Sequence, residues 1–262
     1  DDSEAVIEVD PVKDLVKIDE FSAEGYLTEI YSNKSDFEVG YNELSLRIRD
    51  EANNEYLNAA EVSWMPLMHM ETKEHSAPHS GLSNSVDSSV YTGSIVFQMP
   101  GNEIEYWDLQ VTIKTNGQTI IQTHRISVLQ PNDDLKKLQV FLDNDDTKYV
   151  LAYVDPKNPG IGINELTAVL YKMENMMSFP VVENYVITVD PRMPGMGNHS
   201  SPNNQNLVFN PVTKRYEGKL SLTMTGYWKI NLQLLNESGE TVMGDEVTET
   251  NPASDLYFEL EF

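Results

Sequence analysis

The sequence contains no cysteine, which excludes disulfide bonds, zinc–thiolate centres and a cysteine nucleophile. It also lacks any apolar run close to the ~20 residues that a membrane-spanning helix requires. The motifs G-x-S-x-G and H-E-x-x-H and the phosphate-binding P-loop are missing, so we expect a protein that is not an enzyme. The segment DNDDTKY at 143–149 resembles the start of a calcium loop but lacks the later glycine and glutamate, and we expect a turn there.

Basic residues are scarce: 18 Lys and Arg stand against 42 Asp and Glu, which gives a net charge of −24. A negative field of this size repels phosphate backbones and anionic lipid. We therefore exclude nucleic acid and membrane insertion by this chain. The charge fits a surface that attracts cations or a basic partner, and it equally fits simple solubility.

The 262 residues suit two domains of roughly 100–130 residues each. Several short segments occur twice in the same order, roughly 121 to 128 residues apart, which indicates an internal duplication. The matched pairs are GYNEL with GINEL (from Gly40 and Gly162), WMPLM at 64–68 with RMPGM at 192–196, His75-Ser-Ala-Pro with His199-Ser-Ser-Pro, Tyr91-Thr-Gly93 with Tyr216-Glu-Gly218, Met99 with Met224, and Tyr106-Trp107 with Tyr227-Trp228.

Apolar and polar residues alternate within each copy, as in ELSLRIR at 43–49 and WKINLQL at 228–234. This period of two is typical of strands with one face on a core, and turn signals such as Asn116-Gly117 separate the runs. We predict an all-β protein of two tandem immunoglobulin-like β-sandwich domains. The expected boundaries are an acidic leader at 1–23, a first domain at 24–130, a linker at 131–144 and a second domain at 145–262.

The order of these motifs resembles the YtkA-like and FixH-like domains, which are small exported β-sandwiches related to bacterial copper proteins. The resemblance covers roughly 24–128 and 145–262. It rests on Met65-Pro-Leu-Met68, Tyr91-Thr-Gly93, Met99 and Trp107 in the first copy, and on Met193-Pro-Gly-Met196, Tyr216-Glu-Gly218, Met224 and Trp228 in the second. It implies an exported protein of the cell envelope, held by a lipid anchor upstream of this chain, with copper as its metal.

Thioether and imidazole side chains gather in the segment 65–81, where Pro66 disfavours a helix and we expect a loop. Such soft donors suit copper, especially Cu(I), better than hard cations. The alternative interpretation is that the methionines pack in a core and the histidines lie on surface loops. The candidate metal ligands are Met65, Met68, His69, His75 and His79 in the first copy and Met193, Met196 and His199 in the second.

These observations leave two functions open. The first is a protein that carries, senses or supplies copper or a similar soft metal through its Met/His loops. The second is a non-catalytic interaction or adhesion module of the envelope, with a protein partner and no metal.

Overall fold

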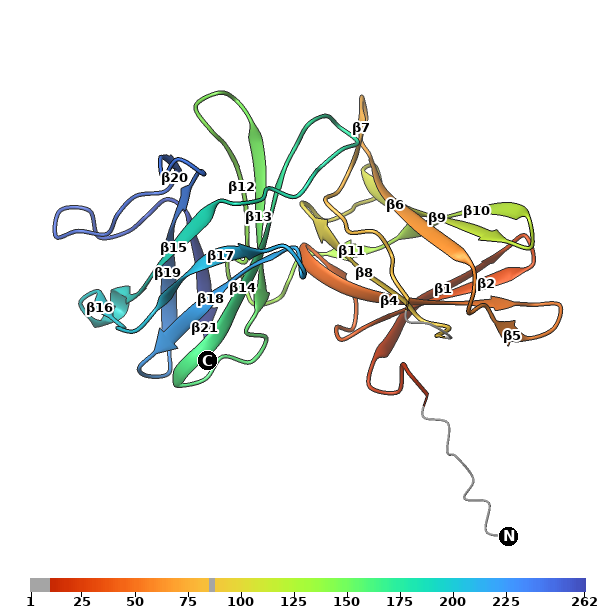
Figure 1. The fold of residues 1–262 in the computed structure, drawn as a ribbon, viewed down its shortest axis with the longest axis horizontal. Helices are drawn as coiled ribbons and strands as arrows, with labels where there is room; N and C mark the ends of the chain where they lie inside the picture. Colours follow the sequence, from red (N-terminus) through yellow and green to blue (C-terminus); the bar gives the residue numbers. More distant parts are fainter. Residues whose placement is uncertain (1–9, 85–87) are drawn as a thin grey trace, which may run out of the picture. The chain divides into compact units, whose positions relative to one another are not determined.

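The computed structural model describes residues 10–84 and 88–262, and the regular secondary structure of this part of the chain is almost entirely β-strand (Figure 1). The predicted all-β class is therefore confirmed, and the described residues include no helix long and apolar enough to cross a membrane. The chain divides into two compact units: unit 1 is built mainly from residues before Gln130, and unit 2 mainly from residues after it.

Unit 1 contains two larger sheets and a separate short parallel pair, β3 with β11. One sheet has the order β1-β2-β4-β5, with β8 beside β4, and the other has the order β10-β9-β6-β7. The strands are β1 (Val16–Ala23), β2 (Tyr26–Ser32), β3 (Phe37–Glu38), β4 (Gly40–Asp50), β5 (Glu55–Tyr56), β6 (Glu61–His69), β7 (Glu74–Ser76), β8 (Tyr91–Phe97), β9 (Tyr106–Thr115), β10 (Gln118–Ile126) and β11 (Val128–Leu129).

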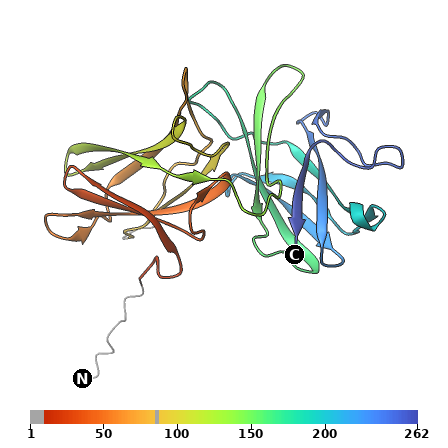
Figure 2. The ribbon, with the colours of Figure 1, turned by 180° about the vertical axis from the view of Figure 1, so that it is seen from behind.

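Unit 2 forms one continuous sheet in the order β12-β13-β14-β18-β17-β15-β19-β20, with β16 beside β15 and β21 beside β19. Seen from behind, the C-terminal strand β21 lies along β19 (Figure 2). The elements are β12 (Leu138–Leu142), β13 (Lys148–Asp155), β14 (Gly162–Lys172), β15 (Val186–Met193), the 3-10 turn η1 (Pro194–Met196), β16 (His199–Ser200), β17 (Gln205–Asn210), β18 (Arg215–Leu222), β19 (Tyr227–Leu235), β20 (Thr241–Met243) and β21 (Tyr257–Glu261).

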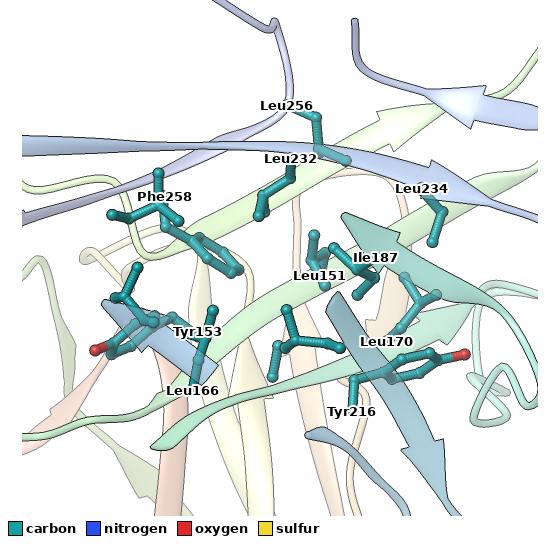
Figure 3. Close-up of a cluster of buried hydrophobic side chains, with 14 of the residues drawn as sticks. Leu151, Tyr153, Leu166, Leu170, Ile187, Tyr216, Leu232, Leu234, Leu256 and Phe258 are labelled. Atoms are coloured by element: carbon teal, nitrogen blue, oxygen red, sulfur yellow. The ribbon is translucent and has the colours of Figure 1, made fainter. Parts of the chain in front are cut away.

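The core of unit 2 lies between two parts of this sheet (Figure 3). Leu151 and Leu170 from β13 and β14 meet Ile187, Leu232 and Phe258 from β15, β19 and β21, and all are at most 1% exposed. Burying such side chains stabilises a fold by about 1.5–3 kcal/mol each. This packing explains the alternation of buried residues along β21, whereas β13 is buried on both faces and is apolar from Tyr149 to Val154.

Two strands lie where the sequence predicts other structure. β1 occupies residues 16–23 of the predicted leader, and β12 occupies residues 138–142 of the predicted linker. Charged residues interrupt the apolar–polar alternation of β1. Pro131 and the acidic residues after it are typical of a linker, and the strand β12 that follows them is short. The rest of the leader, residues 1–9, lies outside the described residues.

Each unit contains the same tryptophan contact. The indole nitrogen of Trp107 donates to the Met99 carbonyl at 3.0 Å, and that of Trp228 donates to the Met224 carbonyl at 3.0 Å. Both rings are fully buried. The paired sequence matches therefore place a buried aromatic anchor on equivalent strands, β9 and β19.

The asparagine of the repeated N-E-L motif also makes the same contact twice. Asn42 accepts from the Glu38 amide at 3.1 Å and donates to the Glu38 carbonyl at 2.7 Å. Asn164 does the same with Gly160 at 3.0 and 2.8 Å. These matched contacts favour the predicted duplication, which stays a prediction.

The glycine of Y-x-G is explained by close packing. A Cβ at Gly93 would lie 2.7 Å from the Trp64 ring, and one at Gly218 would lie 2.6 Å from the Gln205 carbonyl oxygen. Neither position has room for a side chain without displacing its neighbours.

Candidate functional site

Met65 and Met68 lie in a strand, so the expected loop at this position is wrong. They belong to β6, whose side chains alternate between the core and the outer face. Because Met68 follows Met65 by three positions, an odd step along a strand, the two side chains point to opposite faces of the sheet. Met68 is fully buried, whereas Met65 is half-buried and its sulfur accepts from the Ser76 hydroxyl at 3.1 Å. The two sulfurs therefore do not converge on one ion.

Pro66 fits a strand here because it lacks an N–H group to donate. β7 pairs with β6 only from Leu67 onward, so the edge of β6 on that side is unpaired at the proline. Instead of a strand, the Ser76 hydroxyl reaches the Pro66 carbonyl at 2.8 Å. The proline thus marks an unpaired strand edge and not the loop that the sequence led us to expect.

The second copy of the motif is divided between a strand and a turn. Met193 ends β15, is 5% exposed and packs toward Gly226. Met196 lies in η1 and is 59% exposed. His199 is exposed on β16, where its Nε2 lies 3.2 Å from the Thr223 hydroxyl. One sulfur faces the core and the other faces solvent.

Strand register shows that the two M-P-x-M segments are not equivalent. Pro66 is paired with Leu109, two residues after Trp107, and Pro191 is paired with Ile230, two residues after Trp228. The structural counterpart of Pro66 is therefore Pro191 and not Pro194, and that of Met68 is Met193. The sequence alignment of Met65 with Met193 is wrong by three residues.

With this register corrected, a methionine, a histidine and a tryptophan recur together. Met68 is paired with His75, whose ring lies 5.5 Å from that of Trp107. Met193 is paired with His199, whose ring lies 6.3 Å from that of Trp228. Both tryptophans and both methionines of these sets are buried, which fits a packed sandwich end.

The remaining histidines of the first copy have partners of their own. His69 lies between Glu74, 2.8 Å from its Nδ1, and Asp108, 2.8 Å from its Nε2. The two carboxylates approach opposite sides of the ring and so do not share an ion with it. The Nδ1 atom of His79 lies 2.8 Å from the Ala77 carbonyl oxygen. Burial lowers the pKa of His79 below the ordinary 6.5. Within residues 10–84 and 88–262, no group of three His, Asp or Glu side chains is placed to hold a metal.

An open pocket of about 460 Å³ lies where β9 begins and β10 ends, beside the stacked rings of His69 and Tyr106. The ring of Tyr106 stacks on His69 at 4.8 Å, and Arg125 lies over the Tyr106 ring at 4.0 Å. The Arg125 guanidinium also donates to the Asn102 carbonyl at 2.9 Å. Because His69 and Arg125 both pack against the Tyr106 ring, this ring offers little surface on which a ligand could stack.

A second cluster lies on the outer face of the sheet β1-β2-β4-β5, and we call it the Arg47 face. It consists of Lys17, Glu29, Tyr31, Arg47, Arg49 and Tyr56. Arg47 lies directly across the strands from Glu29, and its guanidinium stacks over the Tyr56 ring at 3.5 Å. The Tyr56 hydroxyl donates to Glu29 at 2.9 Å. These contacts hold three side chains of different strands in fixed positions.

Burial and charge change the acidity of the tyrosines on the Arg47 face. Burial, followed by the nearby Glu29 carboxylate, raises the pKa of Tyr31 to about 12. The same two causes raise the pKa of Tyr56. Both phenols are thus neutral at physiological pH and keep the proton with which a tyrosine hydroxyl donates a hydrogen bond, as Tyr56 does to Glu29.

Sequence reasoning placed Arg47 and Arg49 on the outward side of an alternating strand but gave them no role. The sequence does contain one signal for the Arg47 face: on the neighbouring strand β2, Glu29 and Tyr31 flank an apolar residue, as Arg47 and Arg49 do on β4. Their pairing with Arg47 depends on register, which a single sequence does not contain.

Comparisons with known proteins leave the family open. No family model and no curated protein matches the chain. Among solved structures, the chain is similar to the adhesin FdeC of Escherichia coli, with 16% identity over 82% of this chain and 60% of that one, at a TM-score of 0.26. It is also similar to a DUF4785 family protein of Legionella pneumophila, with 9% identity over 84% of this chain and 54% of that one, at a TM-score of 0.26. The chain thus spans less than two thirds of either protein.

Proposed function

We propose that this protein is a non-catalytic binding module of the cell envelope and that it binds a protein partner through the Arg47 face. The observation that carries the proposal is the Glu29–Arg47–Tyr56 contact set on a sheet face. Tyrosine and arginine are enriched where proteins bind one another, and fixed side chains lose little entropy on binding.

The corresponding face of unit 2 supports this assignment by contrast. The positions that match Glu29 and Arg47 are Ala152 and Val169, which are likewise paired across two strands. Both are apolar and at most 3% exposed. The polar and aromatic residues of the Arg47 face thus occur in one unit alone, so the shared scaffold does not require them.

The net charge of −24 adds a condition on the partner. Long-range attraction favours a partner with a basic surface, and raising the salt concentration weakens that attraction. The Arg47 face then provides the short-range contacts, which depend less on salt.

Site-specific photocrosslinking tests the proposal. The full chain carries benzoylphenylalanine at Tyr31 and is exposed to intact envelopes of its source. We expect a discrete protein adduct that is lost when Arg47→Glu is added. Benzoylphenylalanine at Ile121, which is 56% exposed on the other sheet, serves as the control. Equal adducts from both positions, or an adduct that survives Arg47→Glu, would contradict the proposal.

Copper carriage is the competing function, and a separate titration measures it. In a Cu(I) titration under reducing conditions, the binding-module proposal expects no difference between the parent protein and His75→Ala. Stoichiometric binding that His75→Ala or Met68→Ala abolishes, in variants that stay folded, would establish the metal function instead.

A further inference from the structure

The strand β12 ends the sheet of unit 2. Directly before it, the Lys136 carbonyl accepts from the Glu259 amide of β21 at 2.9 Å. From Leu138 to Leu142 the outer edge has no partner strand in the described part of the chain. The Tyr153 amide donates to the Lys137 carbonyl at 2.9 Å, which makes these two residues a hydrogen-bonded pair with β13. In an antiparallel ladder the backbone groups of alternate residues point to opposite sides. The N–H and C=O groups of Leu138, Val140 and Leu142 therefore point away from β13, toward the free edge.

The outward side chains of β12 are apolar as well. Val140 is 42% exposed and Leu142 is 55% exposed, while Leu138 is half-buried. β12 contains no proline, no charged residue and no bulge. Flat apolar edge strands of this kind pair readily with another strand, and proteins usually protect them.

The corresponding edge strand of unit 1 shows such protection. β1 carries Lys17, Asp19 and Glu20, and its register shifts between Lys17 and Asp19. Charges and irregular register both hinder the addition of another strand. The two units thus share an edge strand that is protected in unit 1 and unprotected in unit 2.

We propose that β12 pairs with β12 of a second copy of this chain, antiparallel and about a two-fold axis at Val140. This register places Leu138 opposite the partner's Leu142 and Lys137 opposite the partner's Asp143. The free backbone groups of both strands then satisfy one another, since the same alternate residues face the edge in each copy.

The charges at the two ends of β12 favour a second, antiparallel copy of this chain as the partner strand. The sequence KKLQVFLDNDD has its bases before the strand and its acids after it, so only an antiparallel copy brings opposite charges together twice. Lys137 now lies 2.6 Å from Asp133, its i−4 neighbour, at an exposed site. Exposed pairs of this kind contribute little, so Lys137 can exchange Asp133 for the partner's Asp143.

The dependence of association on salt concentration distinguishes this contact from one driven by overall charge attraction. Each copy carries −24, so two copies repel one another at low ionic strength. We expect association to strengthen as salt rises from about 0.01 to 0.15 M, because the screening length falls from about 30 to about 8 Å. The proposal goes beyond the binding role of the Arg47 face and uses different residues, so each can fail alone.

Sedimentation velocity of the full chain at 0.15 M salt tests the dimer. We expect reversible dimerisation with a Kd of about 10–100 µM, as for a small interface. Val140→Lys and, separately, Leu142→Glu should leave a folded monomer at concentrations where the parent protein is dimeric. Ile121→Lys, at an equally exposed apolar position on the edge strand β10, is the matched control and should not change association.

A charge exchange tests the register. Lys137→Asp or Asp143→Lys alone should weaken the dimer about tenfold, because two symmetric pairs become repulsive. The double variant should restore the parent affinity. A parent protein that stays monomeric, equal effects of Val140→Lys and Ile121→Lys, or a double variant no better than either single one would each overturn the proposal.

Discussion

Truncating the two methionines of β6 should have very different effects on stability, because the strand points them to opposite faces. Met68 is fully buried between the sheets, so Met68→Ala leaves a cavity and should lower the free energy of unfolding by about 2–5 kcal/mol. Met65 is half-buried on the outer face. Met65→Ala should therefore lower the free energy of unfolding by less than about 1 kcal/mol. The Ser76 hydroxyl loses the Met65 sulfur but keeps the Pro66 carbonyl at 2.8 Å.

The same contrast should recur in unit 2 between Met193, which is 5% exposed, and Met196, which is 59% exposed. Met193→Ala should approach the cost of Met68→Ala, and Met196→Ala should be within about 0.5 kcal/mol of the parent protein. This second pair is an internal control because its M-P-x-M spacing is the same while its register differs.

Urea unfolding followed by tryptophan fluorescence measures these differences, since Trp107 and Trp228 report on separate units. If Met65→Ala destabilised unit 1 as much as Met68→Ala, the register of β6 against β9 would be wrong. If all four variants kept the parent stability but lost Cu(I) binding, the methionines would be ligands and the packing argument would fail.

Three further predictions follow from single contacts. Gly218→Ala should destabilise unit 2 by about 1–3 kcal/mol, measured by urea unfolding, because its Cβ would overlap the Gln205 carbonyl; a neutral effect would contradict the close packing. Asn164→Ala should cost about 1–3 kcal/mol in the same assay, because two backbone groups of Gly160 lose their partner. The contribution of Tyr31 to stability should be complete below pH 10 and lost as the pH rises through its folded pKa of about 12, because the unfolded pKa is lower; Tyr31→Phe should flatten this part of the pH profile, and an unchanged profile would refute the assignment.

Much of the fold could be predicted from alternation alone. Runs such as ELSLRIR place apolar residues on every second position, and the structure has them inside β4. β1 escaped prediction because Lys17, Asp19 and Glu20 interrupt the pattern on a strand that lies at a sheet edge. An edge strand buries less surface, so its sequence is less constrained and gives a weaker signal.

The predicted metal ligands show what a motif cannot determine. M-P-x-M has the same spacing in both copies, but spacing gives a side chain its direction only once the local structure is known. In β6 the three-residue step reverses the face, and in the second copy a strand end and a 3-10 turn share the motif. The pairing of Pro66 with Leu109 and of Pro191 with Ile230 fixes the register, and this information lies far away in the sequence.

Comparing equivalent positions separates scaffold from function. Trp107 and Trp228 make the same contact in both units, as do Asn42 and Asn164, so these residues serve the fold. The surfaces do not match in this way. Arg47 with its stacked tyrosine occurs in unit 1, and the apolar edge strand β12 occurs in unit 2. If the two units arose by duplication, the features that differ are those the scaffold does not require, and binding is then best sought at the Arg47 face and at the edge of β12.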